Sequence, residues 1–375
     1  MIRAVLVDDE PPARVRMRQL LDAAGGVTVV GEAGSAVEAR EVIAATRPDL
    51  LFLDVEMPEV RGTALAASLP EPRPFIVFAT AYEHYALDAI SVDATDYLLK
   101  PVSRAKLAAT LERVRARVAR QNVERDVAAA SAVQSQMWPG TLPSIPGFDC
   151  AAASLPARGV GGDFYDVFAL PGRRGGSSDP PRQWALLLGD ASGKGVAAGL
   201  VASAVQARVH TAATLAHLEP APLMAAVDRD VHATTDGARY ATAIYGVLDA
   251  SDARVTLVNA GHPAALLIAA DGSMNEIEAS GPALGLIEAG TFEPRAITLP
   301  SGAILVAYTD GVLDTLDAAD DEFGAARLAE VVTRLQTRTA SAICTAVLDA
   351  VRSHRGHRQD QDDVTIMVIK NAATD

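Results

Sequence analysis

Residues 50–58 read LLFLDVEMP, in which four apolar residues are followed by Asp54. A strand without polar residues is typical of a parallel sheet that helices cover on both faces. Outward from this strand, the pattern predicts alternating elements: strands at 4–7, 27–31, 75–80 and 96–99, and helices at 12–23, 36–46 and around 85–90. Right-handed crossovers then give residues 1–117 a doubly wound, three-layer α/β architecture.

Acidic and polar residues follow the ends of these strands. Ligands of open α/β sheets bind outside the carboxyl ends of the strands, so Asp8, Asp9 and Asp54 are expected to converge. Three neighbouring carboxylates repel one another, and a bound Mg²⁺ relieves that repulsion. Asp54 is then a candidate nucleophile toward a phosphoryl group. Thr80 is placed to hydrogen-bond a phosphoryl oxygen, and Lys100 to supply a compact positive charge.

The segments VDDE, FLDVEMP, ATA and YLLKP, in this order and spacing, closely resemble the phosphoacceptor receiver of two-component response regulators. Residues 81–90 resemble the LytTR-linked branch of that family. The resemblance implies a flavodoxin-like domain in which Asp54 is the phosphorylation site. It also implies that Asp8, Asp9 and the carbonyl of Glu56 hold Mg²⁺ together with Asp54.

The same resemblance assigns the switch residues of the receiver. It implies that Thr80 and Tyr97 form the switch pair and that Lys100 senses the phosphate. A sensor histidine kinase is the implied phosphate source. Phosphorylation would shift a two-state equilibrium of the last receiver helices.

Residues 104–137 are compatible with one helix, because neither glycine nor proline interrupts them before Trp138. We expect residues 118–140 to form a helical linker between two domains. Its apolar seam continues at four-and-three spacing through Val123, Val127, Ala130, Gln134 and Met137, although the step from Val118 breaks the register. Two interpretations stay open: one strand of a short dimeric coiled coil, which would make a homodimer, or a lone helix packed on its own domain.

Residues 141–371 form the second predicted domain. Its strands are mostly sequential: 148–154, 164–168, 184–190, 241–249, 254–259, 264–269, 303–309 and 364–369. Helices are expected at 196–213, 220–235, 323–335 and 340–354. Runs of neighbouring strands with helices inserted between them predict antiparallel sheets with helices packed outside.

Four acidic segments punctuate this second domain: GGDFYD at 161–166, GDASGKG at 189–195, TDG at 309–311 and DDVT at 362–365. Glycine beside an acid permits close backbone approach, so a carbonyl can join carboxylates around an ion. Oxygen ligands of this kind suit Mg²⁺ or Mn²⁺. A pair of such ions about 3.5–4 Å apart can acidify a water that attacks phosphorus in line.

With the segments at 240–249, 259–263 and 281–285, residues 134–370 strongly resemble the SpoIIE/RsbU-type metal-dependent (PPM) protein phosphatases. The resemblance implies an αββα sandwich with two Mn²⁺ or Mg²⁺ ions between its sheets. Asp190 would bridge both ions, with the carbonyl of Ala191 on one of them. Asp310 and Asp362 would complete the other, and Asp163 would act on the second ion directly or through water.

Several neighbouring residues have open roles. The sequence lacks the phosphate-binding arginine of the eukaryotic branch, so substrate phosphate would be held by the metals or by a cation such as Arg158 or Lys194. His262 is either a general acid or a structural residue of its turn. Asp166 is a candidate for a residue that holds the metal ligands in place without binding the metals itself.

Composition excludes other classes. The 375 residues carry a net charge of −14, whereas a nucleic-acid-binding protein normally has a basic face, so binding to nucleic acid is disfavoured. No apolar run approaches the roughly 20 residues of a membrane helix, and the two cysteines form no disulfide framework. A soluble cytoplasmic protein is expected.

The leading hypothesis is a phosphatase that is gated by receiver phosphorylation and acts on phosphoserine or phosphothreonine. The resemblance suggests an anti-anti-sigma (STAS-domain) phosphoprotein as its substrate. The alternative is a sigma-factor-regulating adaptor with a degenerate phosphatase domain, which the retained acids Asp163, Asp190, Asp310 and Asp362 disfavour. A DNA-binding transcription factor is disfavoured because no basic recognition helix follows the receiver.

Overall fold

The computed structural model describes residues 1–81, 94–157, 159–172, 181–235, 237–358 and 362–372. The chain divides into two compact units, unit 1 (Met1–Arg125) and unit 2 (Asp126–Asp375). Among the described residues, no helix is both long and apolar enough to cross a membrane.

Unit 1 is built on a five-stranded parallel sheet in the order β2-β1-β3-β4-β5. The strands are β1 (Ile2–Val7), β2 (Val27–Ala33), β3 (Leu50–Leu53), β4 (Phe75–Thr80) and β5 (Asp96–Leu99). All four residues of β3 are buried, as expected for a central strand covered on both faces. The predicted doubly wound parallel fold is confirmed.

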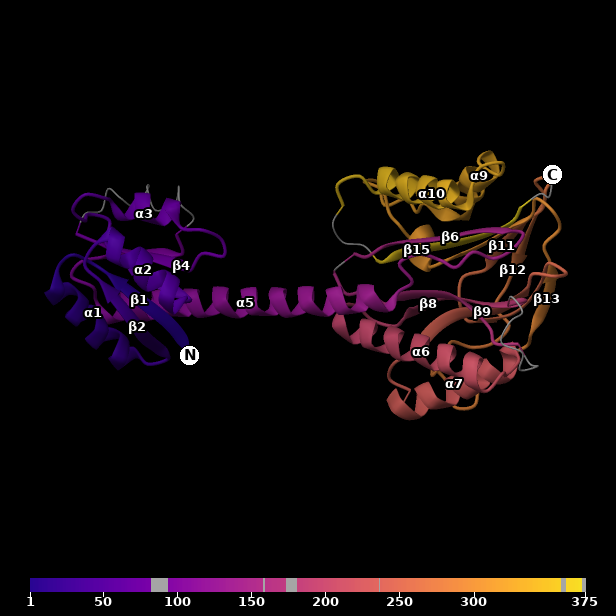
Figure 1. Ribbon diagram of the computed structural model, residues 1–375, viewed down its shortest axis with the longest axis horizontal. Coiled ribbons are helices and arrows are strands. Elements are labelled where there is room, and N and C mark those ends of the chain that lie inside the picture. The colour runs from indigo at the N-terminus through magenta and orange to yellow at the C-terminus, as the bar shows by residue number, and fades with distance from the viewer. Residues whose placement is uncertain (82–93, 158, 173–180, 236, 359–361, 373–375) are drawn as a thin grey trace. The chain divides into compact units, whose positions relative to one another are not determined.

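Helices cover both faces of this sheet (Figure 1). They are α1 (Pro11–Ala24), α2 (Ala36–Thr46), α3 (Gly62–Ser68) and α5 (Arg104–Met137). Leu21 of α1 and Leu111 of α5 share one buried cluster, whereas Ala39 of α2 and Leu65 of α3 share the cluster on the opposite face. The helix predicted around 85–90 lies outside the described residues.

Helix α5 is continuous for 34 residues. Its first turns belong to unit 1, where Leu107, Leu111 and Val114 are buried. Its last turns belong to unit 2, where Gln134 is buried, whereas Val123, near the end of unit 1, is exposed. The burial of Gln134 agrees with a helix packed on its own domain, and the coiled coil stays a prediction.

Unit 2 contains two antiparallel five-stranded sheets, ordered β13-β10-β9-β8-β7 and β12-β11-β14-β15-β6. The first sheet comprises β7 (Asp163–Ala169), β8 (Gln183–Ala191), β9 (Ala241–Asp249), β10 (Arg254–Ala260) and β13 (Arg295–Thr298). The second comprises β6 (Phe148–Leu155), β11 (Ala265–Ile268), β12 (Met274–Ile277), β14 (Ile304–Tyr308) and β15 (Val364–Asn371).

The helices of unit 2 lie outside the two sheets (Figure 1). They are α6 (Val196–Leu215), α7 (Pro220–Thr235), α8 (Asp310–Leu313), α9 (Gly324–Arg334) and α10 (Ala340–Arg355). Apolar side chains fill three layers: α6 and α7 against one sheet, α9 and α10 against the other, and a cluster between the sheets. The predicted αββα sandwich is confirmed.

Candidate functional site

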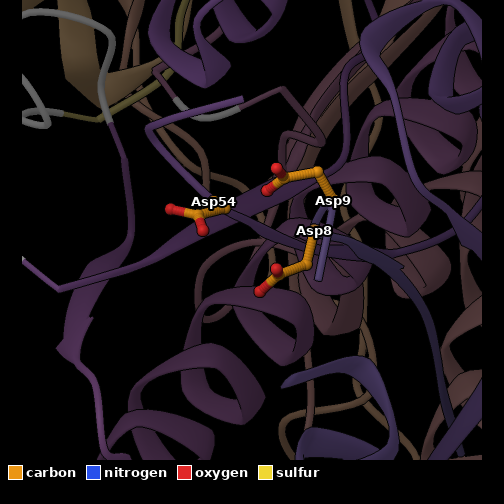
Figure 2. Close-up of side chains that lie close together, drawn as sticks. All are labelled: Asp8, Asp9 and Asp54. Carbon is orange, nitrogen blue, oxygen red and sulfur yellow. The ribbon is translucent and has the colours of Figure 1, made fainter. Parts of the chain in front are cut away.

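Three carboxylates of unit 1 meet at the carboxyl end of its sheet. Asp8 and Asp9 follow β1, and Asp54 follows β3, its neighbour in the sheet. One oxygen from each carboxylate can be chosen so that all three lie within 4.8 Å of one another (Figure 2). Asp8 and Asp54 are buried. The structure therefore brings together the three acids that the sequence predicted as a Mg²⁺ site.

Lys100 lies between two of these acids. Its Nζ is 2.5 Å from Oδ2 of Asp54 and 2.7 Å from Oδ2 of Asp8. Burial raises the pKa of Asp54, and the contact with Lys100 lowers it only in part. Burial lowers the pKa of Lys100, but its contacts with Asp54 and Asp8 outweigh this and raise it overall. The ammonium thus supplies positive charge where a cation or a phosphoryl group would bind.

The other predicted receiver residues border the same site. Thr80 is buried at the end of β4, and its carbonyl accepts a hydrogen bond of 2.8 Å from the backbone N–H of Lys100. The backbone N–H of Glu56 donates to Oδ1 of Asp54 at 3.2 Å. Tyr97 is half-buried on β5, and Nζ of Lys106 lies 5.9 Å from its ring centroid.

In unit 2, Asp163 and Asp190 are direct cross-strand partners at the ends of β7 and β8. Gly162 lies so close that a Cβ on it would be 2.7 Å from Oδ1 of Asp190 and 2.7 Å from the carbonyl oxygen of Ala191. A side chain at this position would displace both oxygens. Glycine is therefore required here, and it lets carboxylate and carbonyl oxygens crowd together.

Asp310 and Asp362 come from the other sheet. Asp310 follows β14 and Asp362 precedes β15, which is paired with β14. Burial raises the pKa of Asp190 to about 7, and the charges of Asp310 and Asp362 raise it as well. The pKa of Asp310 is raised in the same way, by burial and by the charges of the nearby Asp314 and Asp362. The predicted acids thus share one electrostatic environment.

The spacing of these unit 2 acids is wider than that in unit 1. Across the part of the chain that the structure describes, Asp8, Asp9 and Asp54 are the only three acidic, histidine or cysteine residues whose ligand atoms group within 4.8 Å. Lys194, one of the predicted phosphate cations, lies at the unit 2 cluster, with its Nζ 3.1 Å from Oδ2 of Asp362. Arg158, the other, lies outside the described residues.

Asp363 is a site residue that the sequence interpretation missed. Its buried carboxylate accepts hydrogen bonds from the backbone N–H of Ala157 and of Gly162, each at 2.7 Å. It thereby fixes the loop before β7 against the start of β15. The Asp362–Asp363 doublet was the available signal, since one acid of such a pair can join the predicted ligands while its neighbour anchors a loop.

Two threonines were missed as well. The side chains of Thr309 and Thr365 both donate hydrogen bonds to Oδ2 of Asp163, at 2.8 and 2.5 Å. Burial and the nearby Asp190 raise the pKa of Asp163 well above its usual value, and the two threonines lower it only in part. Thr309 adjoins Asp310, so the same contact also positions an acid-bearing loop.

His262 and Asp166 are each held by a neighbouring side chain of unit 2. His262 is buried, its Nδ1 is 2.8 Å from Oγ1 of Thr242, and burial lowers its pKa to about 3. A neutral, enclosed imidazole favours the structural interpretation over a general acid. Asp166 pairs with Nδ1 of His210 at 2.9 Å, away from the other acids.

The end of α5 holds the loop that leads into β7. Gln134 donates from Nε2 to the carbonyl of Gly161 at 2.8 Å and accepts from the N–H of Gly161 at 3.1 Å. Ser131, one turn earlier, donates to the carbonyl of Gly159 at 2.6 Å. This helix therefore fixes the backbone two residues before Asp163.

Comparison with protein families separates the same two parts of the chain. The model for stage II sporulation protein E (SpoIIE) matches residues 180–371, which is more than half of the chain. The model for the response regulator receiver domain matches residues 4–112.

Curated relatives match the receiver part. Transcriptional regulatory protein BtsR of Escherichia coli K12 is 44% identical over 124 residues, which cover 33% of this chain and 52% of BtsR. An uncharacterized response regulatory protein of Yersinia pestis is 46% identical over 115 residues, covering 30% and 48% of the two chains. The chain thus spans about half the length of these relatives.

Solved structures match the phosphatase part. The RsbU and RsbW domains of a Mycobacterium tuberculosis protein align with a TM-score of 0.52 at 27% identity, covering 63% of this chain and 64% of that one. The SiaA-PP2C domain of Pseudomonas aeruginosa aligns with a TM-score of 0.57 at 19% identity, covering 67% and 98%. The second likeness shows the fold alone, a PP2C-like α/β sandwich.

Proposed function

This chain belongs to the SpoIIE family, and we therefore propose that phosphorylation of its receiver controls a metal-dependent protein serine/threonine phosphatase. The observation that carries the proposal is the convergence of acid-bearing loops from both sheets of unit 2. Their carboxylates raise one another's pKa, which is the situation that bound divalent cations relieve.

The donors of unit 2 fit hard cations, because they are carboxylate and carbonyl oxygens. We assign Asp190 as the bridging ligand with the carbonyl of Ala191, and Asp310 and Asp362 as ligands of one ion. Asp163 acts on the second ion, directly or through water. Two Mn²⁺ or Mg²⁺ ions bound here would supply an acidified water for attack on phosphorus.

In unit 1 we assign Asp54 as the phosphoacceptor and Asp8, Asp9, Asp54 and the carbonyl of Glu56 as the Mg²⁺ site. The close approach of Lys100 to Asp54 supports its role as the phosphate-sensing cation. Thr80 and Tyr97 would be the switch pair, and a sensor histidine kinase the phosphate source.

Helix α5 is the element that we propose to carry the signal. It contributes buried side chains to the core of unit 1. In unit 2 it contributes Gln134, whose two hydrogen bonds to the backbone of Gly161 form what we call the Gln134 clamp. A change in its last turns would move the backbone next to Asp163. Dimerisation through residues 118–140 is a second way in which phosphorylation could act on that clamp.

For the substrate we propose a phosphorylated STAS-domain anti-anti-sigma protein. The resemblance of residues 134–370 to the SpoIIE/RsbU-type phosphatases supports this choice, and the M. tuberculosis structure with RsbU and RsbW domains is one such relative. The reaction would couple receiver phosphorylation to the release of a sigma factor.

The test is Mn²⁺-dependent hydrolysis of p-nitrophenyl phosphate by wild type, Asp190→Ala and Asp54→Ala, each with and without acetyl phosphate. Asp190→Ala should abolish turnover because it removes the bridging ligand. Asp54→Ala should keep basal turnover and lose the response to acetyl phosphate. Equal activity of all three proteins, with or without metal, would contradict both assignments.

A further inference from the structure

Three large apolar side chains are exposed near the acid cluster of unit 2. Leu286 and Ile287 are 45% and 49% exposed, and Tyr240 is 36% exposed. Single exposed apolar residues are common on protein surfaces, so exposure alone identifies no interaction site. The position and the backbone support of these three residues distinguish them.

Tyr240 borders the loop that follows β8, and Leu286 and Ile287 come two and three residues after Leu284, which pairs with the start of β9. Ala241 pairs with Ala191 across β9 and β8, and on its other side it exchanges hydrogen bonds of 3.0 and 2.7 Å with Leu284. Because neighbouring strands lie about 4.8 Å apart, Leu284 is about 10 Å from Ala191. Tyr240 is nearer still, since its N–H donates to Oγ of Ser192 at 3.0 Å.

The backbone under Leu286 and Ile287 is fixed. Asp228 of α7 is completely buried, and its carboxylate accepts hydrogen bonds from the N–H groups of Gly285, at 2.8 Å, and Gly290, at 2.9 Å. These two glycines flank the exposed pair on both sides. Apolar side chains on such a backbone are preorganised, so binding a partner costs little ordering entropy.

We propose that Tyr240, Leu286 and Ile287 form a docking surface for the phosphoprotein substrate. The partner would be a folded protein that carries an apolar patch beside its phosphorylated serine or threonine. This inference rests on the proposed phosphatase function and adds to it a site that recognises the protein rather than the phosphate.

Charge and position favour a substrate over a second copy of this chain. Two cations border the same loop: Lys194 beside Asp362, and Arg239, whose Nη1 lies 3.4 Å from the carbonyl of Ser192. They would attract a phosphorylated partner. A second copy seated on the three apolar residues would cover the acid cluster and keep a phosphoryl group from reaching it.

The double variant Leu286→Ser, Ile287→Ser tests the surface in the full-length protein with Mn²⁺. Its kcat/KM is measured on p-nitrophenyl phosphate and on the phosphoserine forms of the STAS-domain proteins encoded in the same genome. The expected result is a fall of at least tenfold in the ratio of phosphoprotein to p-nitrophenyl phosphate kcat/KM, through a higher KM for the phosphoprotein.

The matched control is Leu215→Ser, Leu218→Ser, which changes two exposed leucines, the last residue of α6, about 30 Å from the start of that helix, and a residue just beyond it. The control should leave that ratio at the wild-type value. An unchanged ratio in the Leu286→Ser, Ile287→Ser variant, or an equal fall in the control, would overturn the docking surface.

A binding measurement separates this inference from the proposed function. The phosphoserine STAS proteins are titrated onto Asp190→Asn protein with and without the Leu286→Ser, Ile287→Ser changes, and Kd is read by biolayer interferometry. A Kd at least tenfold higher in the changed protein supports docking even if turnover is absent. Equal Kd values contradict it, whereas absent hydrolysis of both substrates by wild type contradicts the phosphatase assignment.

Discussion

At the scale of single residues, the phosphatase unit depends on buried carboxylates that bind no metal in our assignment. Asp363 accepts two backbone N–H groups at the loop before β7, and Asp228 accepts two at the loop of Leu286. Each carboxylate joins segments that are far apart in the sequence. Their role is to fix where other side chains lie.

Thr365→Val should destabilise unit 2 because it removes one hydrogen-bond donor from the buried carboxylate of Asp163. The expected loss in unfolding free energy is about 1–3 kcal/mol, the usual effect of leaving a buried polar group less satisfied. Urea unfolding measures it. Thr345→Val is the control, since Thr345 is exposed and bonds only within its own helix. An equal effect of the two changes would contradict the role of Thr365.

His262 predicts a pH dependence of stability. Burial lowers its folded pKa to about 3, against 6.5 when exposed, so between these values the unfolded chain binds a proton that the folded chain does not. The stability from neutral His262 is therefore complete above pH 6.5 and lost as pH falls toward 3. The slope approaches about 1.4 kcal/mol per pH unit.

Urea unfolding of wild type and His262→Gln at several pH values, both in EDTA, checks this expectation. Asp163 and Asp190, whose raised pKa values act in the opposite sense, are present in both proteins and cancel in the difference. The wild type should lose stability more steeply than the variant between pH 6.5 and 4.5. Parallel curves would show that His262 does not titrate in this way.

The sequence was sufficient to predict the acids but not their partners. Asp54, Asp190 and Asp310 each follow an apolar strand, so a local pattern marks them. The bond between Thr309 and Asp163 spans 146 positions, and the bond between Asp363 and Gly162 spans 201. No local pattern encodes such contacts, because they depend on how the two sheets pack.

At the scale of elements, long buried strands and helices were predictable, whereas short edge elements were not. The strands β12 and β13 have four residues each, mostly exposed and without polar–apolar alternation. Helices α3 and α8 are also short, with seven and four residues. Such elements form because the adjacent sheet or loop offers them hydrogen bonds, and their own residues give little signal.

Gln134→Ala should weaken metal binding by unit 2. Gln134 makes two hydrogen bonds to the backbone of Gly161, two residues before the assigned ligand Asp163. Loss of a residue that holds a metal ligand in place typically costs about 10–100-fold in metal affinity or activity. The Mn²⁺ concentration for half-maximal hydrolysis of p-nitrophenyl phosphate should therefore rise at least several-fold. Ser135→Ala, on the exposed side of the same helix, should leave it at the wild-type value. A rise in both variants would point to general damage of α5.

At the scale of the whole molecule, metal removal should lower the stability of unit 2, and this loss should depend on Asp190 and not on Asp54. Mn²⁺ at 100 times its Kd stabilises a site by about 2.7 kcal/mol, which raises the melting temperature of a domain of this size by roughly 5–10 °C. Calorimetry should show EDTA lowering the transition of unit 2, and Asp190→Ala should abolish that difference. Asp54→Ala is the control and should preserve it. An EDTA effect that survives Asp190→Ala would place the metal elsewhere.

The Asp163 contact has a mechanical consequence for the sandwich. Asp163 starts β7 in one sheet, whereas Thr309 and Thr365 lie at the end of β14 and in β15 of the other, so their hydrogen bonds pin the sheets together at one edge. Most of the remaining space between the sheets is filled by apolar side chains, whose contacts have no preferred direction, and one further hydrogen bond of 3.3 Å joins Asn259 of β10 to the carbonyl of Ile277 in β12. These directional contacts would resist sliding of the two layers past each other, so the distances between acids from opposite sheets would change least beside Asp163.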